Sequence, residues 1–296
     1  MSKKEIQENT ISDFISLLKP GVMMLIIFTA FAGIILAYAN YQPQNLHPFL
    51  IFIIIFSIAL ASGGSAAINM WYDSDIDRIM KRTQKRAIPS GKIERDDALF
   101  LGIFLSVFAT ILIFTASNLI AGFSLIAAIL FYVLIYTFWL KRRTPQNIVI
   151  GGAAGSFPPF IGYVSISNNF DIEAIILFLI IFLWTPPHFW ALSLYRNSDY
   201  KLAKVPMLPV KKGIKHTVNN IVFYSFLLVI SSFAILINER INIIYLIIAI
   251  PANLIFLYYA FKLKKNTNDK NSIDLFKYSI LYLFLIFLGI IIDALF

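Results

Sequence analysis

The sequence contains no cysteine and few charged residues. The absence of cysteine among 296 residues excludes disulfides, thiolate metal sites and thiolate ligation of haem. Only 14% of the residues are charged, 59% are hydrophobic, and the mean hydropathy is +0.77. An ordinary soluble domain is therefore excluded, and the chain is expected to be an integral membrane protein. Because little polar sequence remains, we expect one domain over residues 1–296, with a short cytoplasmic N-terminal segment, 1–18.

Long apolar runs recur along the chain, and each is long enough to need about 20 residues of transmembrane helix. We predict an all-α membrane protein, a bundle of about nine transmembrane helices. The predicted spans are residues 21–39, 48–68, 98–116, 119–139, 146–166, 173–194, 218–237, 241–260 and 276–295. Two proline pairs, Pro158-Pro159 and Pro186-Pro187, are expected to break the fifth and sixth of these helices.

The basic residues lie almost entirely on one side of the predicted topology. Of the 25 lysines and arginines, 24 fall before the first span or close to the connections after the second, fourth, sixth and eighth spans, which leaves only Arg240 for the other side. The positive-inside rule places those connections and the N-terminus in the cytoplasm and the C-terminus outside. The formal charge of +9 then indicates topology rather than binding of nucleic acid. We expect a multi-pass protein of the bacterial cytoplasmic (inner) membrane, in contact with membrane lipid.

The stretch "NMWYDSDIDRIMKRTQKR" places acidic and basic residues directly after the second span. Asn69, Asp73 and Asp77 are spaced i, i+4, i+8, which sets them on one helical stripe about 12 Å long. Asp75 lies about 200° around the helix from Asp73 and should face solvent or pair with Arg78. Carboxylate and amide oxygens suit Mg²⁺, which completes its shell with water and substrate phosphates. The pattern therefore indicates a diphosphate site, the alternative being a solvated helix end.

A second acidic stretch, "SLYRNSDYK", follows the sixth span. Asp199 stands 126 residues after Asp73, as a weak parallel repeat of four helices would place it, and such a repeat brings both to one face of the membrane. Basic and aromatic residues near the two stretches are candidates for diphosphate contacts, with a role in topology as the alternative. These substrate-binding candidates are Arg82, Arg86, Lys141, Arg142, Tyr195, Arg196 and Lys204.

These stretches resemble the UbiA-type intramembrane prenyltransferases, whose NxxxDxxxD signature is present in "NMWYDSDIDRIMKRTQKR". The haem-farnesylating branch of this family is resembled by three further stretches, "YTFWLKRRTPQNIVIGGAAGSFPPFIGY", "WTPPHFWALSLYRNSDY" and "AKVPMLPV". The resemblance runs from about Lys19 to the end of the ninth span. The resemblance implies the UbiA-type fold and transfer of the farnesyl group of farnesyl diphosphate to a vinyl group of haem b. The products are haem O, which serves terminal oxidases, and diphosphate. The resemblance also implies a haem A synthase as a candidate partner, and it implies that Mg²⁺ binds to the catalytic residues Asn69, Asp73, Asp77 and Asp199.

Two positions depart from the family pattern. The second acidic motif is usually DxxxD, but Tyr195 stands at its first position, which leaves open whether one or two Mg²⁺ ions bind. Ala87 follows Arg86 where proline is common.

Within the sixth span, His188 is a candidate axial ligand of haem iron, the alternative being a buried histidine bonded to a freed carbonyl. Aromatic candidates for contact with the allylic cation or the porphyrin are Trp71, Tyr72, Trp184, Phe189 and Trp190.

Two other functions compete with this interpretation. A transporter or channel for a hydrophobic anion would also use broken helices and polar residues within the bundle, but its acidic groups are expected near the midplane, where these spans have almost no charge. A prenyltransferase acting on a quinone precursor would share the acidic stripe. The sequence by itself leaves the acceptor open between haem b and such a precursor.

Overall fold

The structure is a computed structural model that describes residues 10–44 and 46–296. Within these residues the chain forms helices and no strand. The elements are α1 (Ile11–Leu17), α2 (Pro20–Tyr41), α3 (Pro48–Tyr72), α4 (Ser74–Ile79), α5 (Arg95–Ala116), α6 (Leu119–Leu130), the π-helix η1 (Phe131–Leu140), α7 (Asn147–Ser167), α8 (Ile172–Tyr195), α9 (Asn197–Leu202), α10 (Leu208–Lys212), α11 (Ile214–Ala234), the 3₁₀-helix η2 (Ile235–Ile237), α12 (Ile243–Lys265) and α13 (Asp269–Leu295).

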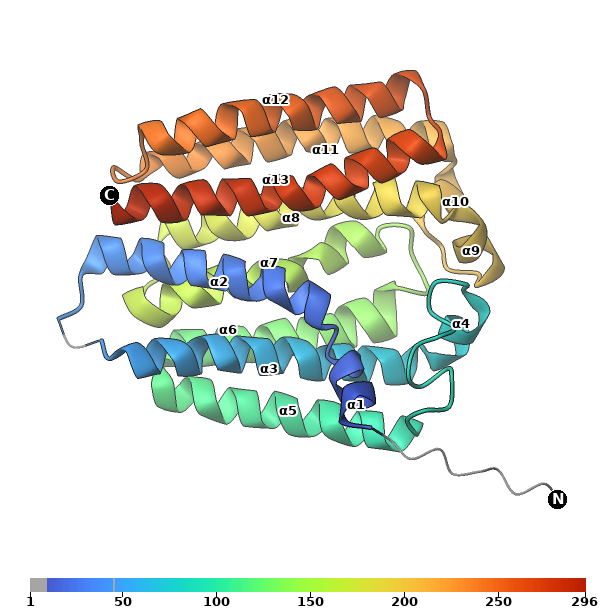
Figure 1. The fold of residues 1–296 in the computed structure, drawn as a ribbon, viewed down its shortest axis with the longest axis horizontal. Helices are drawn as coiled ribbons and strands as arrows, with labels where there is room; N and C mark the ends of the chain where they lie inside the picture. The colour runs from blue at the N-terminus through green and yellow to red at the C-terminus, as the bar shows by residue number, and fades with distance from the viewer. Residues whose placement is uncertain (1–9, 45) are drawn as a thin grey trace.

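Nine helical segments of the described chain are long and apolar enough to cross a membrane, and each coincides with a predicted span. The fourth span is α6 continued by η1, and the seventh is α11 continued by η2. Figure 1 shows these helices lying side by side, with the C-terminus at the end of the bundle opposite α4 and α9. The predicted all-α fold of about nine membrane helices is therefore confirmed.

Glycines allow some of these helices to approach closely. A Cβ added at Gly33 of α2 would collide with the carbonyl of Pro159 in α7, and one at Gly162 of α7 would collide with the carbonyl of Ala30. Small residues are favoured at such crossings because helices in lipid associate through backbone proximity and dispersion contacts. The α2–α7 contact holds α7 in the middle of the bundle, where most of its residues are buried.

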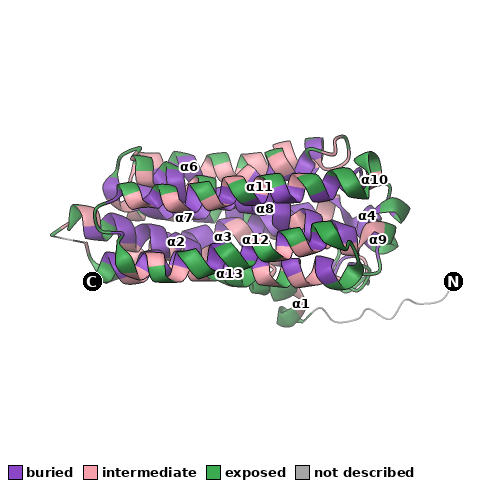
Figure 2. Ribbon diagram, turned by 90° about the horizontal axis from the view of Figure 1, so that it is seen from above, coloured by how far each residue is buried: buried purple, intermediate pink, exposed green. Residues whose placement is uncertain are grey.

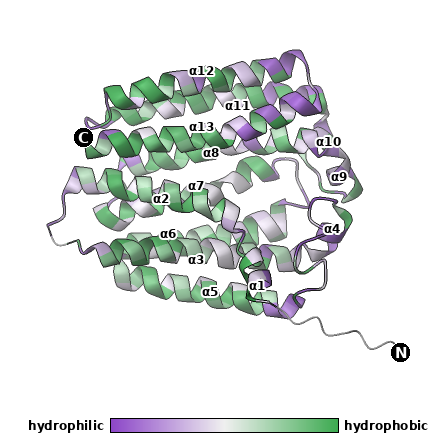
Figure 3. Ribbon diagram, in the orientation of Figure 1, coloured by the Kyte–Doolittle hydropathy of each residue, from purple (hydrophilic) through white to green (hydrophobic). Residues whose placement is uncertain are grey.

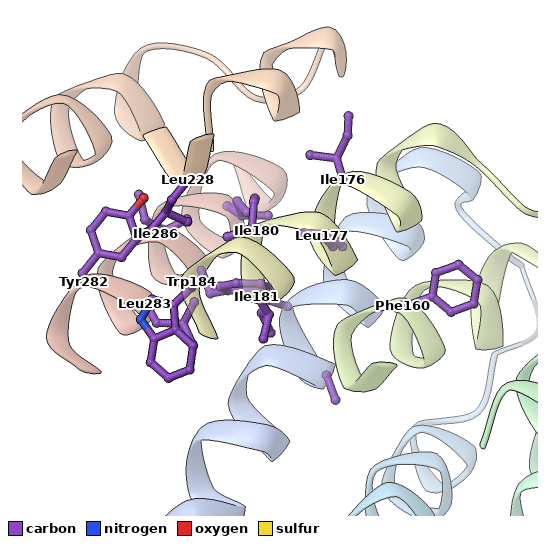
Figure 4. Close-up of a cluster of buried hydrophobic side chains, with 14 of the residues drawn as sticks. Phe160, Ile176, Leu177, Ile180, Ile181, Trp184, Leu228, Tyr282, Leu283 and Ile286 are labelled. Atoms are coloured by element: carbon purple, nitrogen blue, oxygen red, sulfur yellow. The ribbon is translucent and has the colours of Figure 1, made fainter. Parts of the chain in front are cut away.

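The apolar core runs along the length of the bundle. Figure 4 shows part of it, with Ile180 and Trp184 of α8 beside Tyr282 and Ile286 of α13. Large apolar side chains such as Phe100 of α5 are exposed on the outside, as lipid contact requires, and Figure 2 shows green outer faces over a purple interior. Hydrophilic residues gather at one end, around α4, α9 and α10 (Figure 3). We call this the basic end.

The proline pairs do not break their helices, so this prediction was wrong. α7 runs through Pro158-Pro159 and α8 runs through Pro186-Pro187 without interruption. A proline removes one N–H and leaves an earlier carbonyl without its helical partner, but a transmembrane helix tolerates this when neighbouring helices surround it. Both proline pairs are buried, and the indole of Trp184, just before the second pair, donates a 2.7 Å hydrogen bond to the Ser279 carbonyl of α13.

Candidate functional site

The predicted stripe lies at the basic end, where α3 passes into α4. Asn69 belongs to the last turns of α3, Asp73 joins the two helices, and Asp77 lies one turn further along. The Asp73 N–H donates to the Asn69 carbonyl (3.0 Å) and the Asp77 N–H donates to the Asp73 carbonyl (2.9 Å), so helical spacing continues across the junction. The three residues are 3%, 0% and 2% exposed. The stripe is therefore confirmed, and it is buried rather than a solvated helix end.

Both carboxylates of the stripe are paired with predicted basic residues. Lys141, directly after η1, forms an ion pair with Asp73 Oδ2, which also accepts a 2.7 Å hydrogen bond from Asn69 Nδ2. The Arg86 guanidinium lies 2.7 Å from Asp77 Oδ2. Buried carboxylates need such partners because desolvation of an unpaired charge costs several kcal/mol in practice. The loop after α4 thus folds back over the stripe.

A third basic residue, Lys19, reaches the stripe from just before α2, and sequence reasoning did not find it. Its ammonium donates to Asn69 Oδ1 at 3.2 Å. Burial, reinforced by the nearby positive charges of Arg86 and Lys141, lowers the pKa of Lys19 to about 7. The backbone at Lys19 has a φ of 52°, which turns the chain between α1 and α2. A contact across 50 residues of sequence leaves no local signal.

Asp75 faces away from the stripe as expected, but its partner is Arg142 rather than Arg78. Two guanidinium nitrogens of Arg142 donate to the two carboxylate oxygens of Asp75, at 2.6 and 2.7 Å. This pair lowers the pKa of Asp75 and raises that of Arg142. Nη2 of Arg142 also lies 3.0 Å from the Tyr72 carbonyl and 3.4 Å from Asp73 Oδ1. Arg142 therefore links the exposed carboxylate to the buried one.

The half of the fourth span nearest the basic end is a π-helix, which the sequence did not predict. η1 covers ten residues, and its turn is wider than that of an α-helix. The Thr137 hydroxyl accordingly donates to the carbonyl of Tyr132, five residues earlier (2.8 Å). The Lys141 N–H likewise donates to the Tyr136 carbonyl (2.9 Å). π-Helical segments are rare and occur frequently at functional sites. Here the segment sets the register that brings Lys141 to Asp73.

The π-helix also brings Tyr136 and Thr137 to the site. Asn69 Nδ2 donates to the Thr137 hydroxyl (3.2 Å), and the Lys141 ammonium lies 6.0 Å from the centre of the Tyr136 ring. Gly151 of α7 makes room for this ring, because an added Cβ would collide with it. Tyr136 is therefore held between α7 and the lysine that pairs with the stripe.

Asp199 lies in α9, at the same end of the bundle as α4 in both Figure 1 and Figure 2. It is 4% exposed, and its Oδ2 has no hydrogen-bond partner among the described residues. Arg196 stacks its guanidinium on the ring of Tyr195, 4.5 Å from the ring centre. Asp73 and Asp199 thus lie at one end, as predicted, and the repeat itself stays a prediction. Arg82 and Lys204 are exposed at this end and form no ion pair within the described chain.

The oxygen donors at this end fit a hard divalent cation. Asn69, Asp73 and Asp77 supply two carboxylates and an amide on one stripe, and Asp199 adds a buried carboxylate oxygen without a partner. Residues 10–44 and 46–296 contain no group of three or more acidic or histidine side chains close enough to hold a metal by themselves. Any metal here would rely on the amide, water or substrate oxygens as well, which is typical of Mg²⁺.

His188 is packed between two aromatic rings in the interior. Its ring stacks on Trp184 (centroids 4.2 Å apart) and on Phe276 of α13 (4.6 Å). Its Nδ1 lies 2.6 Å from the Ser279 hydroxyl. These contacts support the packing role, although the bond is to a hydroxyl rather than to a carbonyl freed by proline. Ligation of haem by His188 stays a prediction.

The other aromatic candidates lie in two groups. Tyr72 packs on Phe138 of η1 (4.6 Å between centroids) and carries the Arg142 guanidinium on its ring, and Trp71 packs against the same phenylalanine. This group borders the stripe. In α8, Phe189 meets His188 edge to face, and Trp190 is 1% exposed with its indole N–H unpartnered in the described structure.

Similarity to known proteins covers nearly the whole chain. The model of the UbiA prenyltransferase family matches residues 26–288. A protein named protoheme IX farnesyltransferase from Rickettsia akari (strain Hartford) is 50% identical over 289 residues, which are 97% of this chain and 93% of that protein. The protein of the same name from Rickettsia bellii (strain OSU 85-389) is 48% identical over 97% of this chain and 95% of its own length.

Solved structures share the fold at lower sequence identity. A structure described as digeranylgeranylglyceryl phosphate synthase in membranes aligns with a TM-score of 0.76 and 22% identity, over 96% of this chain and 98% of that one. A UbiA homolog from Archaeoglobus fulgidus, bound to DMAPP and Mg²⁺, aligns with a TM-score of 0.66 and 18% identity, over 94% and 99%. At this identity the likeness extends to the fold alone.

Proposed function

Because the chain belongs to the UbiA prenyltransferase family, we propose that it transfers the farnesyl group of farnesyl diphosphate to a vinyl group of haem b, giving haem O and diphosphate. The observation that carries the proposal is the buried stripe of Asn69, Asp73 and Asp77, surrounded by basic side chains at the end of an apolar bundle. The proteins named protoheme IX farnesyltransferase, at about half identity over nearly the full chain, support haem as the acceptor.

The arrangement of charge suits a donor with a lipid tail and an anionic head. The tail is accommodated among the apolar helices, and the diphosphate reaches the basic end. There Lys141, Arg142 and Arg86 stand beside the stripe, and the exposed Arg82 and Lys204 add positive charge at the rim. Arginine suits bidentate phosphate contacts, and lysine acts as a point charge.

A divalent metal, Mg²⁺, would be held by Asn69, Asp73, Asp77 and Asp199. The archaeal homolog bound to DMAPP and Mg²⁺ supports this proposal, as does the unpartnered oxygen of Asp199. When bound, the metal stabilises negative charge that develops on the departing diphosphate. In the structure, oxygens of the stripe are bonded to the cationic groups of Lys19, Lys141 and Arg86. When metal and substrate bind, these cations would turn from the stripe towards the diphosphate.

The reaction breaks the C1–O bond, the vinyl π bond and an O–H bond of water, and it forms a carbon–carbon bond and a carbon–oxygen bond. The bond between C1 of the farnesyl group and the diphosphate oxygen breaks, and its electron pair leaves with the diphosphate. The vinyl group of haem b then forms a carbon–carbon bond to C1, and water adds to the resulting porphyrin-stabilised cation with loss of a proton. The chain's own contribution is to neutralise the diphosphate through the basic residues and to present aromatic faces, among them Tyr72 and Tyr136, near the allylic cation.

The proposal extends to the setting of the enzyme. We place the basic end in the cytoplasm of a bacterial cell, with the chain in the inner membrane, on the one-sided distribution of lysine and arginine. Haem O would pass to a haem A synthase, which we propose as a partner. A quinone precursor and the transport of a hydrophobic anion are weaker candidates, because the curated relatives are named for farnesyl transfer to protoheme.

The function is tested by the haems that the protein makes. Expression in a bacterial strain that lacks haem O formation, followed by mass spectrometry of extracted haems, should reveal haem b that has gained a farnesyl group and the elements of water. Purified protein with haem b, farnesyl diphosphate and Mg²⁺ should release diphosphate together with the same product. Unmodified haem in both experiments, with protein present in the membrane, would overturn the proposal.

A further inference from the structure

A second charged feature adjoins the stripe on the side of α1. A cavity of about 380 Å³ lies between α1, the residue before α2, the end of α3 and the loop around residues 85–92. Four basic side chains line it, Lys19, Lys85, Arg86 and Lys92, whereas Asp13 is its one acidic residue. Figure 1 shows α1 towards this end of the bundle, where a short turn joins it to α2.

The cavity is next to the diphosphate site without being the same site. Lys19 and Arg86 line the cavity and also contact the stripe, through Asn69 and Asp77 respectively. A ligand in the cavity would thus share two basic residues with the diphosphate site.

The charges within the cavity do not balance. Lys92 is paired with Asp13, with 3.1 Å between Nζ and Oδ1, and Arg86 is paired with Asp77. Lys19 and Lys85 have no carboxylate partner among the described residues. Lysines that converge on a concave site without matching carboxylates favour an anionic ligand. Met70 and Ala87 contribute an apolar wall, so the cavity suits an anion carried on an apolar body.

We propose that this cavity binds the propionate carboxylates of the haem acceptor. The inference rests on the proposed function and names the part of the same site that receives the second substrate. The porphyrin of haem b carries its two propionates on adjacent rings and its vinyl groups on the other two, so holding the carboxylates orients the macrocycle and selects the vinyl group presented to C1 of the farnesyl group. Anchoring a non-reacting part of a substrate is an established means of positioning the reacting part.

The occupant is assigned by comparison with the farnesyl diphosphate head. That head is already surrounded by cations at the stripe, and a free diphosphate has no apolar part to contact Met70 and Ala87. A carboxylate edge of an otherwise apolar ring matches both walls of the cavity. The rival occupants, released diphosphate and a lipid headgroup phosphate, are distinguished by the experiment below.

The test measures haem binding in the absence of farnesyl diphosphate, by titrating the full-length protein and following the Soret band. Lys85→Gln should raise the Kd for haem b on the order of tenfold, the effect of losing one charge-assisted contact. The same variant should leave the Kd for haem b dimethyl ester unchanged, because the ester has no carboxylate. Asp13→Asn should have the opposite effect and lower the Kd for haem b, since it removes the only negative charge in the cavity.

The control is Lys211→Gln, which removes another exposed lysine, in α10 at the same end but outside the cavity. It should change neither Kd. Equal effects of Lys85→Gln on haem b and its dimethyl ester would overturn the proposal, as would no effect on either. If Lys85→Gln changed only the inhibition of the enzyme by added diphosphate, the cavity would be assigned to diphosphate instead. If it changed only the dependence of activity on anionic lipid vesicles, the cavity would be assigned to a lipid headgroup phosphate. Because binding is read without turnover, absence of farnesyl transfer in the wild type would overturn the proposed function separately.

Discussion

Asp75 and Arg142 form a bidentate ion pair, with oxygen–nitrogen distances of 2.6 and 2.7 Å, although 67 residues separate them in the chain. The Asp75 side chain is 63% exposed, whereas Asp73, two residues earlier, is completely buried. The two carboxylates are thus neighbours in sequence with different surroundings. One lies within the proposed metal stripe and the other positions an arginine at its edge.

This difference predicts different effects of the same substitution. Asp73→Asn keeps the size of the side chain but removes the charge facing Lys141 and the proposed metal, so haem O formation should fall on the order of 10²-fold or more. Asp75→Asn weakens only an exposed pair worth about 0–1 kcal/mol, so activity should fall less than about fivefold. The measurement is product formation across a Mg²⁺ titration, with protein amounts matched. Equal losses in the two variants would mean that the cluster acts as bulk charge.

Asp199 provides a second prediction, in which stability and activity change in opposite directions. Its side chain is buried and its Oδ2 has no partner in the described structure, so removing the charge relieves a desolvation cost without breaking a hydrogen bond to that atom. We expect Asp199→Asn to raise the Tm of the metal-free protein while lowering turnover on the order of 10²-fold. Differential scanning fluorimetry with and without Mg²⁺ reads the first effect. A fall in both Tm and turnover would indicate a structural role.

How much of the site the sequence predicts depends on whether its contacts are local. The stripe follows from i, i+4 spacing, which the backbone keeps across the α3–α4 junction. The contact between Lys19 and Asn69 joins distant segments, and no residue pattern marks it. The register of η1 is equally hidden, because Tyr132 and Tyr136 are spaced as in an α-helix. At the proline pairs the local pattern predicts too much. Proline propensity predicts a break in each helix, but the surrounding helices allow α7 and α8 to continue.

His188 yields a prediction that separates packing from ligation. Its ring lies between Trp184 and Phe276, so His188→Ala opens a cavity and should lower the Tm of the detergent-solubilised protein. If the packing role is correct, the Soret maximum of bound haem b should stay where it is in the wild type. A shifted Soret maximum together with weakened haem binding, and unchanged binding of farnesyl diphosphate, would instead establish His188 as an iron ligand.

Membrane topology is predicted by the basic residues. A reporter fused after Phe296 should report the outer face, and one inserted near Lys212 should report the cytoplasm, because three spans separate the two positions. Alkaline phosphatase and green fluorescent protein fusions give complementary signals on the two sides. Finding both positions on one side would remove a span from this account.

The last prediction concerns the π-helix and uses two glycines of one helix. Gly151 and Gly155 are one turn apart in α7, but a Cβ at Gly151 would collide with the ring of Tyr136, whereas a Cβ at Gly155 would meet no atom within 4 Å. The collision can be relieved only if the ring or η1 moves, and η1 carries Lys141 at its end.

Gly151→Ala should therefore lower haem O formation at least about tenfold, because a displacement of roughly 1 Å at a positioning group is costly. Gly155→Ala should retain activity and raise stability by about 0.5–1 kcal/mol, since alanine favours a helix over glycine. The double variant Gly151→Ala/Tyr136→Ala removes the clash, because alanine lacks the Cγ, Cδ2 and Cε2 atoms that the added Cβ would meet. If displacement of Lys141 is the cause, the double variant should recover part of the activity that Gly151→Ala loses. Full activity in Gly151→Ala would show that the close packing of Tyr136 on α7 plays no part in positioning the lysine.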